Sequence, residues 1–151
     1  MNTYMAVLIA LLVAAAFAAV IFVLYRDRQR RLAPPEMDEM EGHDFEYYCA
    51  DILRGCGFTD VRVTRGSGDF GADILAGKDG VSYAVQCKCY NAPVGVQAVQ
   101  EAYAGKGFYD AMVGAVMTNC YFTRPAVTLA GKLNILLWDR EALEEMAESA
   151  D

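Results

Sequence analysis

Hydrophobic and polar positions divide this chain into two parts with different patterns. Every position from Tyr4 to Tyr25 is apolar. From residue 39 onward, apolar residues recur at helical spacing in some stretches and at every second residue in others. The pattern predicts an apolar N-terminal segment followed by one globular domain over residues 39–151, which is long enough to bury a core.

Within the domain, the periodicity predicts helices and strands of a mixed α/β unit. Helices are expected over 40–56, 94–108, 122–133 and 141–147, and strands over 58–64, 72–76, 81–89, 111–118 and 134–138. In the second helix, the spacing of Val96, Val99 and Tyr103 predicts one buried face. The order is helix, three strands, helix, strand, helix, strand, helix. The alternation of the later strands with helices favours parallel pairing there.

The apolar segment over residues 4–25 has the length and flanks of a membrane span. At about 1.5 Å per residue, its helix would reach roughly 33 Å, against about 30 Å for the hydrocarbon core. Four arginines follow it within residues 26–31, which favours a cytoplasmic location for its C-terminal side. No basic residue precedes it, which argues against a cleaved signal peptide. We expect a single-pass anchor in the inner or plasma membrane, a juxtamembrane linker over residues 26–38, and a cytoplasmic domain.

Charge and cysteine content narrow the class of protein. From Glu36 onward the chain has nine basic and 19 acidic residues, which argues against tight DNA binding, because phosphate contacts need Lys and Arg. The five cysteines include no Cys-x-x-Cys pair, and His43 is the only histidine. These residues do not match a zinc site. We expect the cysteines to be reduced core residues in a reducing compartment.

The most informative segment is a predicted β-hairpin that brings unlike polar groups together. A two-residue turn at Asp79-Gly80, a sequence typical of type I′ turns, places Asp73 opposite Gln86. A turn one residue earlier places Asp73 opposite Ala84. Because side chains alternate along a strand, any even-length turn keeps Asp73 on the face that carries Gln86 and Lys88.

The residue types on that face suit phosphodiester chemistry. A carboxylate with nearby oxygens suits Mg²⁺, which keeps several waters and takes one or two carboxylates. An adjacent ammonium group can stabilise a developing anion. The alternative is a structural cross-strand ion pair between Asp73 and Lys88.

At these residues the sequence resembles the Mrr-like restriction endonucleases of the PD-(D/E)xK nuclease superfamily. The similarity covers the leading helix, the hairpin and the later strands. The matching segments are Met40-Glu41-Gly42, Phe45-Glu46, Gly57-Phe58, Gly68 to Asp73, Val85 to Lys88, Thr118-Asn119, Phe122-Thr123 and Leu137-Trp138-Asp139. The resemblance implies a restriction-endonuclease-like fold, a mixed β-sheet flanked by helices, that cleaves DNA with a divalent metal.

The resemblance also implies roles for five site residues. Asp73 would be the principal metal carboxylate and Lys88 the catalytic lysine. Gln86, which stands where many superfamily members have Glu or Asp, would contribute an oxygen, and Cys87 its backbone carbonyl. Glu46 on the first helix would reach the metal through water or complete a second metal position. The implied cofactor is Mg²⁺ or Mn²⁺.

Three further residues are candidates for contact with DNA. Arg65 could bind a phosphate, or it could be a solvated arginine. Asp69 could join the site or shape its glycine-rich loop. Asn119 follows a buried strand, where ligand contacts often lie. The expected partners are DNA and, through residues 4–25, the membrane. A homodimer, with a second copy of the chain, is a further candidate assembly.

These observations lead to one hypothesis and two alternatives. The hypothesis is a membrane-anchored, Mg²⁺-dependent DNA endonuclease of restriction or defence type. The first alternative is a catalytically weak, membrane-tethered module of the same fold that binds nucleic acid or protein. The acidic balance favours this alternative, and the intact set of Asp73, Gln86 and Lys88 argues against it. The second alternative is a resolvase of branched DNA.

Overall fold

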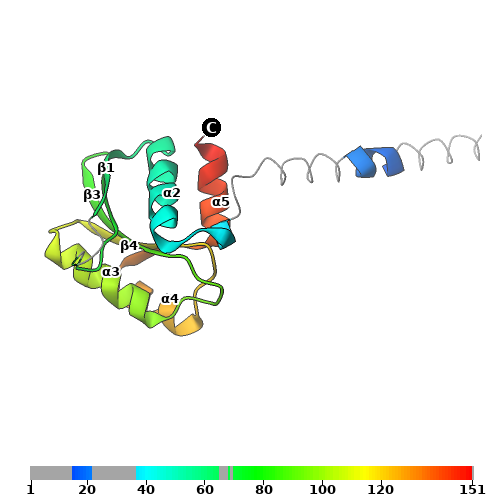
Figure 1. Ribbon diagram of the computed structural model, residues 1–151. Helices are drawn as coiled ribbons and strands as arrows, with labels where there is room; N and C mark the ends of the chain where they lie inside the picture. The colour runs from blue at the N-terminus through cyan, green and yellow to red at the C-terminus, as the bar shows by residue number, and fades with distance from the viewer. Residues whose placement is uncertain (1–14, 22–36, 65–67, 69, 151) are drawn as a thin grey trace, which may run out of the picture. The chain divides into compact units, whose positions relative to one another are not determined.

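The computed structural model describes residues 15–21, 37–64, 68 and 70–150, and the chain forms two units, residues 1–36 and 37–151. In the first unit, residues 15–21 are helical and exposed (Figure 1). No helix within the described ranges is long and apolar enough to cross a bilayer. The predicted membrane span over 4–25 and the linker over 26–38 fall mostly outside the described residues, so both stay predictions.

The second unit contains all the helices and strands that the periodicity predicts, in the predicted order. The helices are α2 (Gly42–Gly55), α3 (Val96–Phe108), α4 (Arg124–Leu133) and α5 (Arg140–Ser149), and the strands are β1 (Thr59–Val63), β2 (Ile74–Lys78), β3 (Val81–Lys88), β4 (Val113–Thr118) and β5 (Ile135–Trp138). A short 3₁₀ helix, η1 (Met37–Glu39), precedes them and was not expected from the pattern. The α/β class is therefore confirmed.

The five strands form one mixed sheet in the order β1-β2-β3-β4-β5. The first three pair antiparallel, and β3, β4 and β5 pair parallel, as the alternation with helices predicts. The β2–β3 hairpin turns at Asp79 and Gly80, which both have positive φ, at 52° and 79°, as a type I′ turn requires. Lys78 pairs with Val81 and Ile74 with Val85. Continued by one residue, this register places Asp73 opposite Gln86, as predicted.

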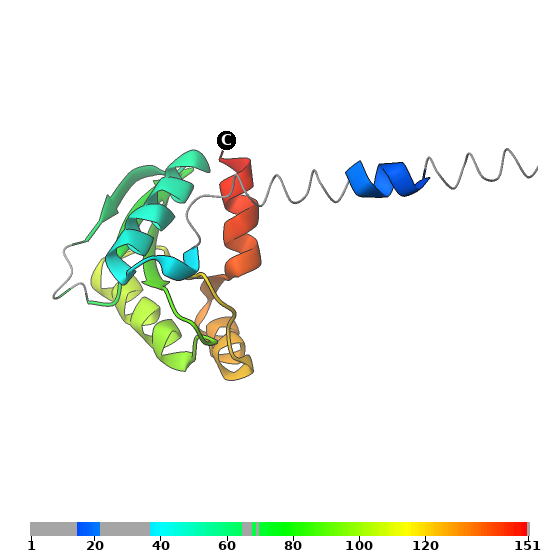
Figure 2. The same cartoon turned by 45° about the vertical axis from the view of Figure 1, so that its right-hand side comes forward.

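Helices cover both faces of the sheet (Figures 1 and 2). One hydrophobic cluster joins α2 and α5 to one face, and it includes Phe45, Leu53, Val85, Met117 and Leu143. A second cluster joins α3 and α4 to the other face through Val99, Ala102, Val116, Ala126 and Ala130. Because residues alternate along β3, Val85 and Cys87 face α2, and Gln86 and Lys88 face α3. The polar site therefore lies on the α3 side of the hairpin.

The buried face of α3 differs from the one that the pattern predicts. Tyr103 is 51% exposed and Val96 is 38% exposed, whereas Ala98, Val99, Ala102 and Gly105 are buried. Small residues face the sheet because α3 approaches the loop before β2 very closely: a Cβ on Gly105 would lie 2.5 Å from the carbonyl oxygen of Gly71. The larger side chains therefore turn outward.

Candidate active site

Asp73 and Gln86 meet at the open end of the β2–β3 hairpin. Both side chains are buried, with 6% and 5% exposure. The Gln86 side-chain amide donates a hydrogen bond to Asp73 Oδ2. The backbone N–H of Cys87 donates to the same oxygen at 2.7 Å. The Asp73 carboxylate is therefore held within the sheet by two donors from β3, which offsets part of its burial cost.

The backbone on both sides of Asp73 is also fixed. Its N–H donates to the carbonyl of Val85 at 2.8 Å, and its carbonyl accepts from the N–H of Thr64 at 2.8 Å. The Thr64 hydroxyl donates to the carbonyl of Ala72 at 2.8 Å. These bonds tie the residue to the strand on each side, so the carboxylate has a defined position although it precedes the first residue of β2.

Lys88 lies two residues after Gln86 on the same strand face, and its ammonium pairs with a carboxylate that the sequence pattern did not single out. Nζ is 2.6 Å from Oε2 of Glu101 on α3. Glu101 Oε1 accepts from Gln97, one turn earlier, at 3.0 Å. Burial alone would lower the pKa of Lys88, but the hydrogen bond and charge of Glu101, joined by the charges of Tyr90 and Asp73, raise that pKa above its ordinary value. Lys88 is therefore an ammonium at neutral pH.

Glu46 approaches the same strand from the other side of the sheet. It lies on α2, its side chain is 19% exposed, and its Oε2 is 3.0 Å from His43 Nδ1. The thiol of Cys87 has its pKa raised well above 9.0 by a hydrogen bond with Cys49 and by burial, and the charges of both Asp73 and Glu46 add to the shift. The charges of both carboxylates therefore act on the Cys87 thiol, and Asp73 also accepts a hydrogen bond from the Cys87 N–H.

The loop before Asp73 is pressed against α3. Gly71 has φ of 92°, and a Cβ there would lie 2.1 Å from the carbonyl oxygen of Glu101. Phe70 has φ of 52°, and its ring stacks on Phe108 at a centroid distance of 3.9 Å. Only glycine fits at position 71, because any side chain there would clash with α3. This contact joins the loop before Asp73 to the helix that carries Glu101.

Of the three predicted DNA-contacting residues, the structure describes one, and that residue has its polar contacts elsewhere. Asn119 is 1% exposed. Its Oδ1 accepts from the N–H of Tyr90 at 2.8 Å, and its Nδ2 donates to Asp38 at 3.0 Å. Both ends of the amide are thus used within the protein, which favours a structural role. Arg65 and Asp69 lie outside the described residues.

The donor set at the hairpin fits a hard divalent cation. Asp73 supplies a carboxylate, Gln86 an amide oxygen, and Cys87 a backbone carbonyl that lies 3.4 Å from Gln86 Nε2. Ligands of this type suit Mg²⁺ or Mn²⁺ with several waters. The amide of Gln86 turns its nitrogen toward Asp73, so rotation of that amide would present its oxygen to a cation. Across the described part of the chain, no three His, Cys, Asp or Glu side chains form a metal cluster.

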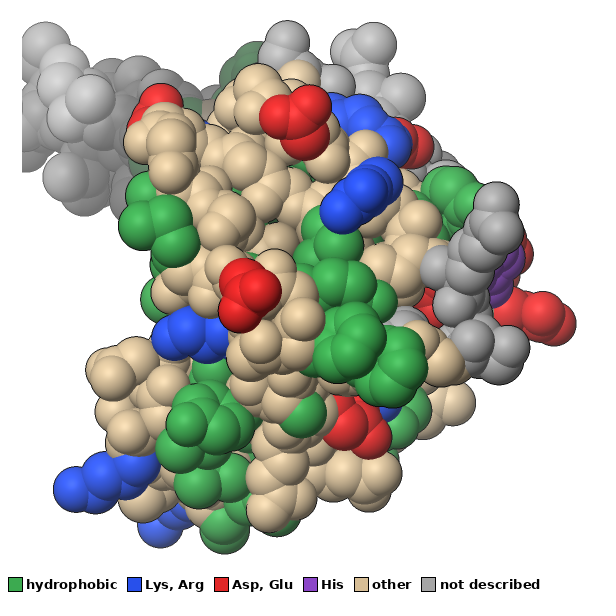
Figure 3. All heavy atoms as spheres, turned by 90° about the vertical axis from the view of Figure 1, so that its left-hand side faces the viewer, with side chains coloured by type: hydrophobic (Ala, Val, Ile, Leu, Met, Phe, Trp, Pro, Cys, Tyr) green, Lys and Arg blue, Asp and Glu red, His purple; other side chains and the backbone are tan. Residues whose placement is uncertain are grey.

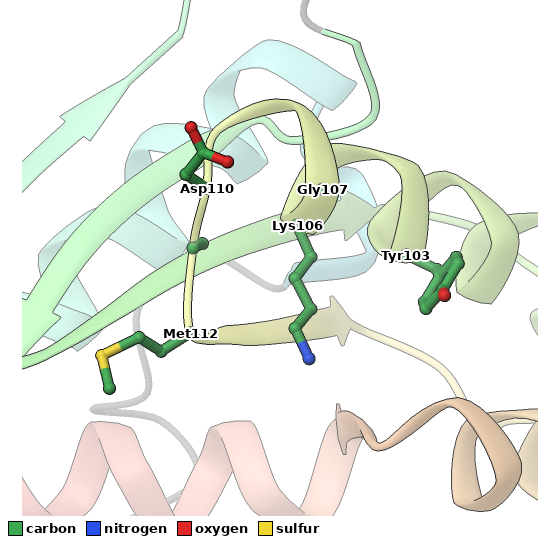
Figure 4. A pocket seen from close by; sticks show the side chains of 6 residues that line it. Tyr103, Lys106, Gly107, Asp110 and Met112 are labelled. Carbon is green, nitrogen blue, oxygen red and sulfur yellow. The ribbon is translucent and has the colours of Figure 1, made fainter.

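On the face seen in Figure 3, the basic side chains of the described residues are scattered among acidic and hydrophobic ones. An open pocket of about 480 Å³ lies at the C-terminal end of α3, and Figure 4 shows Lys106 and Asp110 pointing in opposite directions from its wall. None of the candidate catalytic residues lines this pocket.

Comparison with known proteins identifies the family. A family model described as a restriction endonuclease, Mrr_cat, matches residues 37–147. The chain therefore belongs to this restriction endonuclease family, and the predicted Mrr-like similarity is confirmed. No curated protein matches the chain.

Solved structures show the same fold. A protein of unknown function, AF1548, has a TM-score of 0.59 and 23% identity over 70% of this chain. The DNA modification-dependent restriction endonuclease AspBHI has a TM-score of 0.58 and 20% identity over 81%. The MspJI restriction endonuclease, in complex with a 27-mer oligonucleotide, has a TM-score of 0.54 and 20% identity over 85%. The chain spans 66%, 38% and 30% of these three chains.

Proposed function

We propose that this chain is a metal-dependent DNA endonuclease that hydrolyses phosphodiester bonds, with Asp73, Gln86 and Lys88 as its central residues. The observation that carries the proposal is the buried contact between Asp73 and Gln86, beside the ammonium of Lys88, in a domain of the restriction endonuclease family. The MspJI endonuclease, which shares the fold, was solved with a 27-mer oligonucleotide, and AspBHI, which also shares it, is described as a DNA modification-dependent restriction endonuclease. These two neighbours support DNA as the substrate class.

The proposed cofactor is Mg²⁺ or Mn²⁺, held by Asp73, the amide oxygen of Gln86 and the carbonyl of Cys87. Glu46 would reach it through water or complete a second position, and the effect of its charge on the Cys87 thiol supports this. When bound, such an ion would lower the pKa of a nearby water and offset charge on a phosphoryl oxygen. The buried position of Asp73 keeps the negative charge that attracts the cation out of bulk water.

Lys88 would act on the phosphate rather than on the cation. As an ammonium, it can donate hydrogen bonds to the attacking water or to the phosphoryl oxygens, where charge develops in the transition state. Its pairing with Glu101 leaves two further N–H groups on the ammonium. The side chain is 17% exposed, so the ammonium is partly desolvated, which strengthens its interaction with an anion.

We also propose that the domain is held on the cytoplasmic side of a membrane. The support is sequence alone: the apolar run over 4–25 and the four arginines that follow it. Selective extraction tests this. The full chain should remain with membranes in high salt and carbonate and leave them only in detergent. Release by salt would contradict the anchor without touching the nuclease proposal.

The nuclease proposal is tested by plasmid cleavage. The full chain in non-ionic detergent should nick or cut supercoiled DNA with Mg²⁺ or Mn²⁺ and should stop when a chelator is added. Asp73→Asn keeps the shape of the side chain and removes its charge, and it should lower the cleavage rate by about 10³-fold. Equal cleavage by Asp73→Asn and the wild type would overturn the proposed site.

A second candidate, a DNA- or protein-binding module with little catalysis, is favoured by one observation. The Gln86 amide donates to the very oxygen of Asp73 that a cation would use, so the site is stable as it stands. Calorimetric titration separates the candidates: the endonuclease should bind Mn²⁺ at millimolar concentration or tighter. A chain that shows no binding would be the module.

A further inference from the structure

The ion pair between Lys88 and Glu101 is partly buried, since the two side chains are 17% and 30% exposed. Glu101 Oε2 is buried, and among the described residues it accepts no hydrogen bond of good geometry; its ion-pair partner is the Lys88 ammonium, at 2.6 Å. The other carboxylate oxygen is held by Gln97 from the preceding turn of α3. The backbone carbonyl of Glu101 also packs closely against Gly71, where an added Cβ would lie 2.1 Å from the carbonyl oxygen. Glu101 is thus in contact with the loop that leads to Asp73.

The charges around the hairpin show what this pair does. Among the proposed cation ligands at the hairpin, Asp73 alone carries a negative charge, because Gln86 is neutral. Lys88 places one positive charge two residues further along the same strand face, and this charge repels a divalent cation. Glu46, on α2, is the other carboxylate proposed at the cation. Glu101 brings a further negative charge to within 2.6 Å of the lysine and offsets the repulsion.

We propose that Glu101 is a positioning residue that holds Lys88 beside the phosphate and neutralises its charge toward the cation, an inference that rests on the proposed function. It explains how a site with a neutral residue at position 86 could still bind a divalent cation next to a lysine. Glu101 itself need not touch the cation or the substrate, because its effect passes through Lys88. Gln97 supports the same arrangement by fixing the carboxylate.

The test is a cycle of charge substitutions read by Mn²⁺ affinity. The full chain in non-ionic detergent is titrated with Mn²⁺ in a calorimeter. Glu101→Gln keeps the shape and leaves Lys88 uncompensated, so affinity should fall about tenfold, the size expected for one charge a few ångströms from a divalent ion in a largely aqueous setting. The double variant Glu101→Gln with Lys88→Met has no net charge at the pair, as in the wild type, and affinity should return to within about twofold.

Controls separate this effect from a loss of structure. Asp110→Asn removes one negative charge just after the same helix, at a residue with φ of 51° that Asn tolerates, and it should leave Mn²⁺ affinity unchanged. Glu101→Asp keeps the charge and should weaken binding by no more than about threefold. If Glu101→Gln does not fold, the charge of Glu101 is still tested by comparing Lys88→Met with the double variant. Lys88→Met keeps the negative charge of Glu101, so it should bind Mn²⁺ more tightly than the double variant.

Each outcome decides the inference. Recovery of affinity in the double variant supports it, since a residue needed only for folding or a direct metal ligand would not be rescued by removal of Lys88. Unchanged affinity in Glu101→Gln, or a loss that the second substitution does not restore, overturns it and leaves the proposed endonuclease standing. A wild-type chain that binds no Mn²⁺ overturns both.

Discussion

The carboxylate of Asp73 accepts a hydrogen bond from the side-chain amide of Gln86, the residue that lies opposite it across the hairpin. Both residues are almost fully buried. The amide has one nitrogen and one oxygen on the same carbon, so it can donate to the carboxylate in one orientation and present an oxygen to a cation in the other. A neutral residue at this position thus stabilises the site without metal, and under the proposed function it would also supply a ligand oxygen when metal is bound.

Gln86→Glu should make the stability of the domain depend on metal. The substitution would bury a second carboxylate against Asp73, and like charges at this distance disfavour ionisation of both. In chelator, the melting temperature should fall by about 4 °C or more, which corresponds to roughly 1 kcal/mol for a domain of this size. Saturating Mg²⁺ should recover most of the loss, while the wild type changes less. A loss that Mg²⁺ does not reduce would contradict the proposed metal position.

Gly105→Ala should destabilise the domain and impair cleavage together. The added Cβ would lie 2.5 Å from the carbonyl oxygen of Gly71, so α3 and the loop before Asp73 would have to separate. We expect a loss of about 1–3 kcal/mol in the free energy of unfolding, as for other overpacked sites, measured by urea denaturation. Gly107→Ala on the same helix is the control: no atom lies within 4 Å of its Cβ. This control should be neutral or stabilising by up to about 1 kcal/mol, and equal losses in the two variants would contradict the packing argument.

Asp38 should contribute stability that disappears in acid. Its hydrogen bonds and ion pair with Arg140 lower its pKa below the ordinary 3.8, with a further contribution from Asn119, against a smaller opposing effect of burial. Because the folded pKa is depressed, the contribution is fully present above about pH 4 and is lost as the pH falls through the folded value. Asp38→Asn should therefore cost about 0.5–1 kcal/mol at neutral pH, since the pair is partly exposed. The difference should shrink as the pH falls below the ordinary pKa of 3.8. A constant difference across this range would show that the charge is not involved.

The sequence was sufficient where local rules determine the structure. The type I′ turn at Asp79-Gly80 sets the pairing of the whole hairpin, and with it the shared face of Asp73, Gln86 and Lys88. The order of helices and strands followed from hydrophobic periodicity in the same way. The register is predictable because a shift of one residue would move every apolar side chain of β3 to the wrong face of the sheet.

The partner of Lys88 could not be predicted in this way. Which face of α3 packs on the sheet depends on the close approach between Gly71 and Gly105, a contact across 34 positions of sequence. The larger side chain of Tyr103 suggested the opposite face, yet it lies outside. Two pairs of residues in the sequence could have indicated the correct face, because residues four positions apart lie on the same side of a helix. Ala98 and Ala102 are small residues that pack toward the sheet, and Gln97 and Glu101 are polar residues that lie toward the site. Asn119 was a similar case, because its burial depends on Asp38 and Tyr90 from distant segments.

The rate of DNA cleavage by Lys88→Ala tests the account most directly. Single-turnover cleavage is measured with Mg²⁺ and saturating DNA, so that the chemical step rather than binding is observed. Lys132→Ala, an exposed lysine at the end of α4, is the matched control and should cleave at the wild-type rate. The account predicts that Lys88→Ala slows the step by at least about 100-fold, as for loss of a group that stabilises transition-state charge. Cleavage by Lys88→Ala at the wild-type rate would contradict it.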